Sequence, residues 1–150
     1  MAPTHVYLDT SVYNRPFDDQ SQPRIWLETL AVSIILQMLE EGAVELVSST
    51  VVAYETSRNP DEMRRRWVQQ IAEKASLIQR VNDDVKQRAQ ELERHGLKAL
   101  DALHIAVAEA AQVNCFVTCD DRLIRRYRAN SKLLIVVCTP TEFVENFTGD

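Results

Sequence analysis

Short apolar segments alternate with helical patterns along this chain, and no other feature constrains its fold as much. The first apolar segment, residues 5–8, ends at Asp9 and is followed by a polar stretch and then by apolar positions at helical spacing over residues 25–41. Further strand-like segments occupy residues 44–47, 75–81, 114–119 and 133–138, with helical patterns between them. Strands that alternate with helices form a parallel sheet with helices on both faces. The sequence therefore predicts a three-layer α/β/α sandwich whose central parallel sheet has four to five strands.

The length of the chain fits one domain of this kind. Folding of 150 residues buries about 69% of the surface of the unfolded chain, which is enough for a hydrophobic core without disulfides. We therefore expect residues 1–150 to form a single domain. The first ten residues do not resemble a secretory signal, and no apolar run is long enough to span a membrane. We expect no membrane association and a cytoplasmic location.

The cysteines support a reducing compartment. Cys115, Cys119 and Cys138 are odd in number and lie on apolar, strand-like segments. They contain no C-x-x-C pair, which argues against a zinc site. We therefore expect three buried free thiols.

The net charge of −5 restricts the partners of the chain. It argues against a protein that holds nucleic acid through an overall positive field. It does not exclude an enzyme that acts on nucleic acid, because carboxylates that bind a divalent cation make a chain acidic while the cation reverses the charge of the site itself.

Four acidic residues are predicted to meet at one edge of the sheet. Asp9 and Asp120 directly follow predicted strands, Glu55 lies on the helix after the second strand, and Asp101 lies in the first turn of its helix. The carboxyl ends of parallel strands share an edge with the N-terminal ends of the following helices, and sites in open α/β sheets form there. Clustered carboxylates repel one another, and a hard divalent ion such as Mg²⁺ or Mn²⁺ relieves that repulsion. The competing interpretation is that these acids are helix caps, which is common for any one of them alone.

The same residues carry a resemblance to a known family. Residues 6–12, VYLDTSV, resemble the first motif of the PIN domain, the metal-dependent ribonuclease fold of VapC-type toxins. Residues 49–55 resemble its second motif, Ser-x-x-x-x-x-Glu. Residues 100–106, LDALHIA, resemble the third, and residues 116–120, FVTCD, resemble the fourth. The stretch DTSVYNRPFDDQ, residues 9–20, also resembles a subgroup of PIN-containing proteins without assigned targets. The gap between the first two motifs is longer than is usual in the family.

The resemblance implies roles for individual residues. The acidic metal site would consist of Asp9, Glu55, Asp101 and Asp120, and the neighbouring Asp121 is a further candidate ligand. Thr10 and Ser11 would hold Asp9 or the phosphate of the substrate, and Thr118 would orient the loop before Asp120.

Three other residues near the motifs need separate interpretation. Arg15 and Arg122 flank the proposed site in the sequence, where they would meet RNA phosphates or simply face solvent. His104 lies three residues after Asp101, on the same helix face. A general base is one interpretation of His104, and packing on an apolar helix face is the favoured one.

Together these observations predict an Mg²⁺- or Mn²⁺-dependent endoribonuclease, which the resemblance implies is the toxin of a toxin–antitoxin pair. Its partners would be an RNA substrate, an antitoxin protein and a second copy of the chain, with an apolar stripe such as Leu27, Ile34 and Met38 as the dimer surface. The alternative is a non-catalytic module of the same fold that binds RNA or a protein. A haloacid-dehalogenase-type phosphatase also places an Asp after the first strand, but it needs a second Asp where this chain has Ser11.

Overall fold

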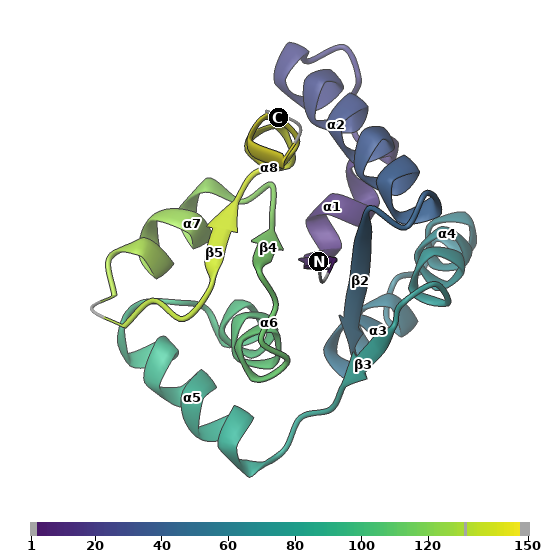
Figure 1. Ribbon diagram of the computed structural model, residues 1–150. Coiled ribbons are helices and arrows are strands. Elements are labelled where there is room, and N and C mark those ends of the chain that lie inside the picture. Colours follow the sequence, from purple (N-terminus) through teal and green to yellow (C-terminus); the bar gives the residue numbers. More distant parts are fainter. Residues whose placement is uncertain (1–2, 131, 148–150) are drawn as a thin grey trace.

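The computed structural model describes residues 3–130 and 132–147 of the chain (Figure 1). Its centre is a five-stranded sheet in the order β3-β2-β1-β4-β5, in which every pair of neighbouring strands is parallel. The strands are β1 (Thr4–Leu8), β2 (Val44–Ser49), β3 (Leu77–Gln79), β4 (Cys115–Val117) and β5 (Val136–Cys138). The predicted α/β/α sandwich with four to five parallel strands is confirmed.

Helices cover both faces of the sheet. Helix α2 packs against α8 on one side, and α5 packs against α6 on the other (Figure 1). The strand order accounts for this arrangement, because the chain adds β2 and β3 on one side of β1 and then β4 and β5 on the other side. Crossovers of the usual right hand in two opposite directions place the connecting helices on opposite faces. The helices are α1 (Thr10–Asn14), the 3₁₀ turn η1 (Arg15–Phe17), α2 (Pro23–Glu40), α3 (Thr50–Ser57), α4 (Glu62–Ala72), α5 (Asp83–Arg94), α6 (Ala99–Ala110), α7 (Asp121–Arg128) and α8 (Pro140–Phe147).

Local sequence explains where the helices start and stop. The side chains of Ser49, Asp61, Asn82 and Asp120 each accept hydrogen bonds from backbone N–H groups of the helix that follows them. Helix α2 is followed by Gly42, which has a φ of +75°, a conformation that suits glycine. The strand–cap–helix sequence brings the first turns of α3 and α7 to the carboxyl edge of the sheet.

The core is continuous across the sheet. Val6, Tyr7 and Leu8 of β1 are almost completely inaccessible, as is Phe116 of β4, whose ring stacks on Tyr7 at 5.2 Å between centroids. Strand β1 lies at the centre of the sheet, and its last three residues are buried, which explains why residues 6–8 are continuously apolar. The residue that follows β1 is therefore held in place by packing on every side.

The structure differs from the sequence-based expectations at several segments, and β3 covers only Leu77–Gln79 of the predicted 75–81. Residues 14–23 are predicted as a polar loop, but the turn η1 occupies residues 15–17, directly after the short helix α1 at residues 10–14. Strand β5 is predicted over residues 133–138, but only residues 136–138 pair with β4. The backbone N–H groups of Leu134 and Ile135 instead donate to the hydroxyl of Tyr127, and the Leu133 and Leu134 side chains are exposed. Residues 133–138 are all apolar, so the sequence does not distinguish the residues that pair with β4 from those that only lead into the strand.

The three cysteines are buried and free, as predicted. The Sγ atoms of Cys115 and Cys138 lie 2.9 Å apart on neighbouring strands. Among the described residues, no helix has both the length and the apolar character needed to cross a bilayer.

A buried ion pair links α5, α6 and α7 away from the carboxyl edge. The Arg88 guanidinium donates to both carboxylate oxygens of Glu109, at 2.7 and 3.1 Å, and the Tyr127 hydroxyl donates to Glu109 at 2.8 Å. Because Arg88 also donates to the Lys132 carbonyl, this cluster fixes the segment that leads into β5.

Candidate metal centre

The candidate site lies where the chain changes direction in the sheet. Strands β1 and β4 are neighbours, yet the connections that leave them run to opposite faces, and such switch points form crevices at the carboxyl edge. Leu8 pairs with Val117, and the Asp9 N–H donates to the Val117 carbonyl at 3.0 Å. Asp9 and Thr118 therefore lie side by side at the ends of neighbouring strands, although they are far apart in the sequence.

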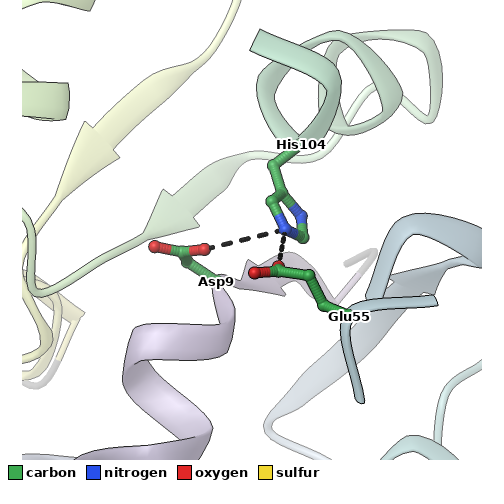
Figure 2. A group of neighbouring side chains, drawn as sticks. All are labelled: Asp9, Glu55 and His104. Carbon is green, nitrogen blue, oxygen red and sulfur yellow. Dashed lines mark hydrogen bonds and ion pairs between the residues drawn. The ribbon is translucent and has the colours of Figure 1, made fainter. Parts of the chain in front are cut away.

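Two hydroxyl groups fix the Asp9 carboxylate. Asp9 is only 5% exposed, and its Oδ2 accepts hydrogen bonds from Ser11 Oγ at 2.9 Å and from Thr118 Oγ1 at 2.7 Å. Thr118 Oγ1 also accepts from the Asp120 N–H. Oδ1 is left pointing toward the side chains of Glu55 and His104 (Figure 2). The predicted supporting roles of Ser11 and Thr118 thus correspond to contacts with the first acid of the site.

Glu55 reaches the same point from α3. Its Oε1 accepts a hydrogen bond from Thr10 Oγ1 at 2.9 Å and also contacts Nε2 of His104. Partial burial alone would raise the pKa of Glu55, but the hydrogen bonds from His104 and Thr10 outweigh it and hold that pKa below its usual value. Glu55 is therefore ionised at neutral pH, and its Oε2 makes no hydrogen bond within the described residues.

Asp101 and Asp120 complete the acidic cluster. Burial, together with the negative charges of Asp9 and Asp120, raises the pKa of Asp101 to about 6. Asp120 caps α7, since its Oδ1 accepts from the N–H groups of Arg122 and Leu123 at 2.9 and 3.3 Å. Only one oxygen of Asp120 is used in this way. The cap interpretation and the metal interpretation are therefore compatible for this residue.

His104 lies at the centre of the cluster. It is 1% exposed, its Nε2 lies 4.0 Å from Asp9 Oδ1, and its Nδ1 is 2.7 Å from the Tyr7 hydroxyl. The sequence analysis favoured simple packing for His104. Its position one turn after Asp101 indicates that His104 lies near the acids, but the other buried positions of α6 are mostly apolar and therefore favour packing. Its contacts with Tyr7 and Glu55 join distant parts of the chain and leave no pattern in the sequence.

Other predicted site residues face elsewhere. Both carboxylate oxygens of Asp121 accept hydrogen bonds from Arg24, at 2.5 and 2.7 Å, and these hold the pKa of Asp121 below its usual value. Arg15 is paired with the buried Glu28 at 3.1 Å and with Asp18 at 3.0 Å. Arg122 is exposed, and its side chain forms no ion pair with the described residues. Arg122 is therefore available to an anion, whereas Arg15 and Asp121 are already paired.

The arrangement fits a divalent cation. Ligand atoms of Asp9, Glu55 and His104 all lie within 4.8 Å of one another (Figure 2). The carboxylate oxygens left without a hydrogen bond, together with the nearby Asp101 and Asp120, give an oxygen-rich donor set of the kind that Mg²⁺ and Mn²⁺ prefer. A single ion would relieve the repulsion from Asp9 and Asp120 that, after burial, contributes to the raised pKa of Asp101.

A PIN domain family model matches residues 6–129, and the chain belongs to the PIN domain family. Among solved structures, the fold resembles VapBC2 from Rickettsia felis bound to a promoter DNA fragment, at 13% identity with a TM-score of 0.57, over 91% of this chain and 98% of that one. It also resembles VapBC-5, a member of the VapBC family of toxin–antitoxin systems from Mycobacterium tuberculosis, at 16% identity with a TM-score of 0.50, over 91% of this chain and 99% of that one. No curated protein matches the chain.

Proposed function

We propose that this protein is an Mg²⁺- or Mn²⁺-dependent endoribonuclease and the toxin of a toxin–antitoxin pair. The observation that carries the proposal is the cluster of Asp9, Glu55 and His104 at the switch point of a PIN-domain sheet. Asp101 and Asp120 are added to the proposed ligand set because the charges of Asp9 and Asp120 act on the Asp101 carboxyl. The site is rich in carboxylate oxygens and lies at the end of two buried strands, which suits the positioning of a cation against a phosphodiester.

In this proposal the chain supplies a rigid set of ligands. Asp9 is the central ligand, because Ser11 and Thr118 occupy one of its oxygens and turn the other toward the cluster. Glu55, Asp101 and Asp120 surround it. These residues would hold a divalent ion, which would supply charge neutralisation at the phosphate and activation of the attacking water. The exposed Arg122 would contact a neighbouring RNA phosphate.

Asp121 lies outside the ligand set that we propose, and this is tested by comparison with Asp120. Asp121→Asn is expected to leave the affinity for Mn²⁺ within about twofold of wild type, because a surface ion pair with Arg24 contributes little. Asp120→Asn is expected to weaken Mn²⁺ binding by at least about tenfold. Asparagine is as good a helix cap as aspartate, so α7 stays intact in this variant. Calorimetric titration measures both affinities, and equal losses in the two variants would show that the ligand assignment is wrong.

The antitoxin and a second copy of the chain are proposed as partners. The similarity in fold to chains of two VapBC structures supports the first. The second is supported by exposed apolar side chains along α2, namely Trp26, Leu27, Leu30 and Ile34. Met38, which the sequence analysis placed on this stripe, is instead 7% exposed and packs in the core.

The α2 surface makes a prediction about oligomeric state. At micromolar concentration we expect a dimer by sedimentation velocity. Leu30→Arg should yield a monomer, because it places a charge at the centre of the exposed apolar stripe on α2. Gln90→Arg, at an exposed position of α5, is the control and should leave the dimer intact. A wild-type protein that sediments as a monomer over this range would eliminate the proposed dimer surface.

The activity itself is tested by incubating the purified chain with single-stranded and structured RNA. We expect cleavage with Mg²⁺ or Mn²⁺, no cleavage with EDTA, and products that carry a 5′-phosphate and a 3′-hydroxyl. A chain that binds Mn²⁺ and RNA but cuts neither RNA under any of these conditions would favour the non-catalytic alternative.

A further inference from the structure

Three buried polar side chains form a line behind the candidate metal centre. Ser49 at the end of β2, Tyr7 in β1 and His104 in α6 are each 1% exposed or less. Ser49 Oγ lies 2.7 Å from the Tyr7 hydroxyl, and the Tyr7 hydroxyl lies 2.7 Å from His104 Nδ1. The other imidazole nitrogen, Nε2, contacts Glu55 Oε1. Burial of polar side chains costs free energy unless each one is hydrogen-bonded, and each of these three side chains has a hydrogen-bond partner.

The protons along this line have a consistent order. Glu55 Oε1 already accepts from Thr10 Oγ1, and its contact with His104 Nε2 is a second such hydrogen bond when Nε2 carries the proton. In the neutral imidazole, Nδ1 then accepts from the Tyr7 hydroxyl, and the Tyr7 oxygen accepts from Ser49. Ser49 Oγ in turn accepts from the Val52 N–H at 3.1 Å, which is also the N-cap bond of α3. The line is therefore anchored in the backbone of the helix that carries Glu55.

This line determines how Glu55 is presented. Thr10 and His104 both bond to Oε1, which leaves Oε2 as the oxygen with no hydrogen bond among the described residues. The imidazole itself cannot turn, because Tyr7 holds its far side and its ring lies edge-on to the Tyr7 ring at 5.8 Å between centroids. Without this support, a partly exposed glutamate would sample several rotamers.

We infer that His104, held by Tyr7 and Ser49, is a positioning residue that fixes the Glu55 carboxylate for metal binding. The inference depends on the proposed function, since it assigns Glu55 a metal to bind. Under this inference, His104 does not act as a general base, and its role is more than packing in the core. It also predicts that the effect of His104 on the metal passes entirely through Glu55.

The test is a double-mutant cycle with Mn²⁺ affinity as the readout, measured by calorimetry on the full chain without RNA. We expect His104→Leu to weaken Mn²⁺ binding by about 10- to 100-fold, the usual effect of losing a residue that orients a ligand. His104→Gln retains an N–H donor near the position of Nε2, and we expect it to recover most of that loss. In a Glu55→Gln background, His104→Leu should cause little further weakening.

Tyr7→Phe provides a variant that keeps the packing. It removes only the hydroxyl, so the ring still stacks on Phe116, and we expect an intermediate loss of Mn²⁺ affinity. Thermal unfolding of each variant confirms that the titrations are made on folded protein. Because Tyr7→Phe and His104→Gln change little volume, they keep the test decisive should His104→Leu fail to fold.

Three outcomes would overturn the inference. His104→Leu and His104→Gln both binding Mn²⁺ as tightly as wild type would show that His104 only packs. Losses that add fully in the Glu55→Gln background would show an effect independent of Glu55. Nitrogen hyperfine coupling from His104 in the Mn²⁺ electron paramagnetic resonance spectrum would make it a direct ligand. If the wild-type chain itself binds no Mn²⁺, the proposed function fails, and this inference fails with it.

Discussion

Asp9→Asn is expected to reduce RNA cleavage by at least about 100-fold while the protein stays folded. Asparagine keeps an oxygen for the hydrogen bonds from Ser11 and Thr118, so the loop after β1 is preserved. The amide nitrogen then occupies the position of Oδ1, and an N–H donor replaces a ligand oxygen. Loss of one negative charge also relieves repulsion with Asp101, which favours the folded state without metal.

The cleavage measurement uses a matched control. Glu93→Gln removes the same charge from an exposed position in the last turn of α5, at the end of that helix away from the carboxyl edge, and should cut RNA at the wild-type rate. Initial rates for the three proteins are compared in parallel preparations with saturating Mn²⁺. Equal rates for Asp9→Asn and wild type would mean that the observed nuclease does not use this site.

Glu109→Leu is expected to destabilise the fold by about 3–5 kcal/mol, the usual cost of leaving one partner of a buried ion pair without the other. Arg88 would lose two hydrogen bonds and Tyr127 one, in a region where Glu109 is 8% exposed. The free energy of unfolding from urea titration measures this loss. Glu109 lies in the last turn of α6, at the opposite end of that helix from Asp101, so the Mn²⁺ affinity of the folded variant should not change.

Two further variants test the physical cause of that loss. Combining Glu109→Leu with Arg88→Leu removes both charges and should recover part of the stability, because no buried charge is then left unpaired. Glu91→Ala removes only the more exposed partner of Arg88, at 3.1 Å, and should cost less than about 1 kcal/mol. A Glu109→Leu protein within about 1 kcal/mol of wild type would contradict the account of this cluster.

The sequence predicted the fold and the placement of the acids for a clear physical reason. Asp9 and Asp120 follow strands that pair with each other, and residues at the ends of adjacent parallel strands must be neighbours. Their positions therefore follow from chain order once the sheet is recognised. Asp101, in the first turn of α6, is brought to the same edge by the direction of its helix.

What the sequence did not predict depends on contacts between distant side chains. Tyr7 lies in an apolar strand, and nothing in that strand indicates that its hydroxyl bonds His104. Asp121 follows Asp120 directly, but Arg24, which is 97 residues away in the sequence, pairs with it. Helix α1 has only five residues, too few for a helical pattern to emerge. These features arise from packing and pairing, which local patterns do not encode.

The most direct test of the account is the position of Mn²⁺ in a crystal of this chain, located by anomalous diffraction. The account predicts a peak at coordination distance from Asp9 Oδ1, with oxygens of at least two of Glu55, Asp101 and Asp120 in the same coordination sphere. Carboxylates that diverge around empty solvent, with the manganese bound elsewhere on the surface, would contradict the proposed chemistry and leave only the PIN-domain fold.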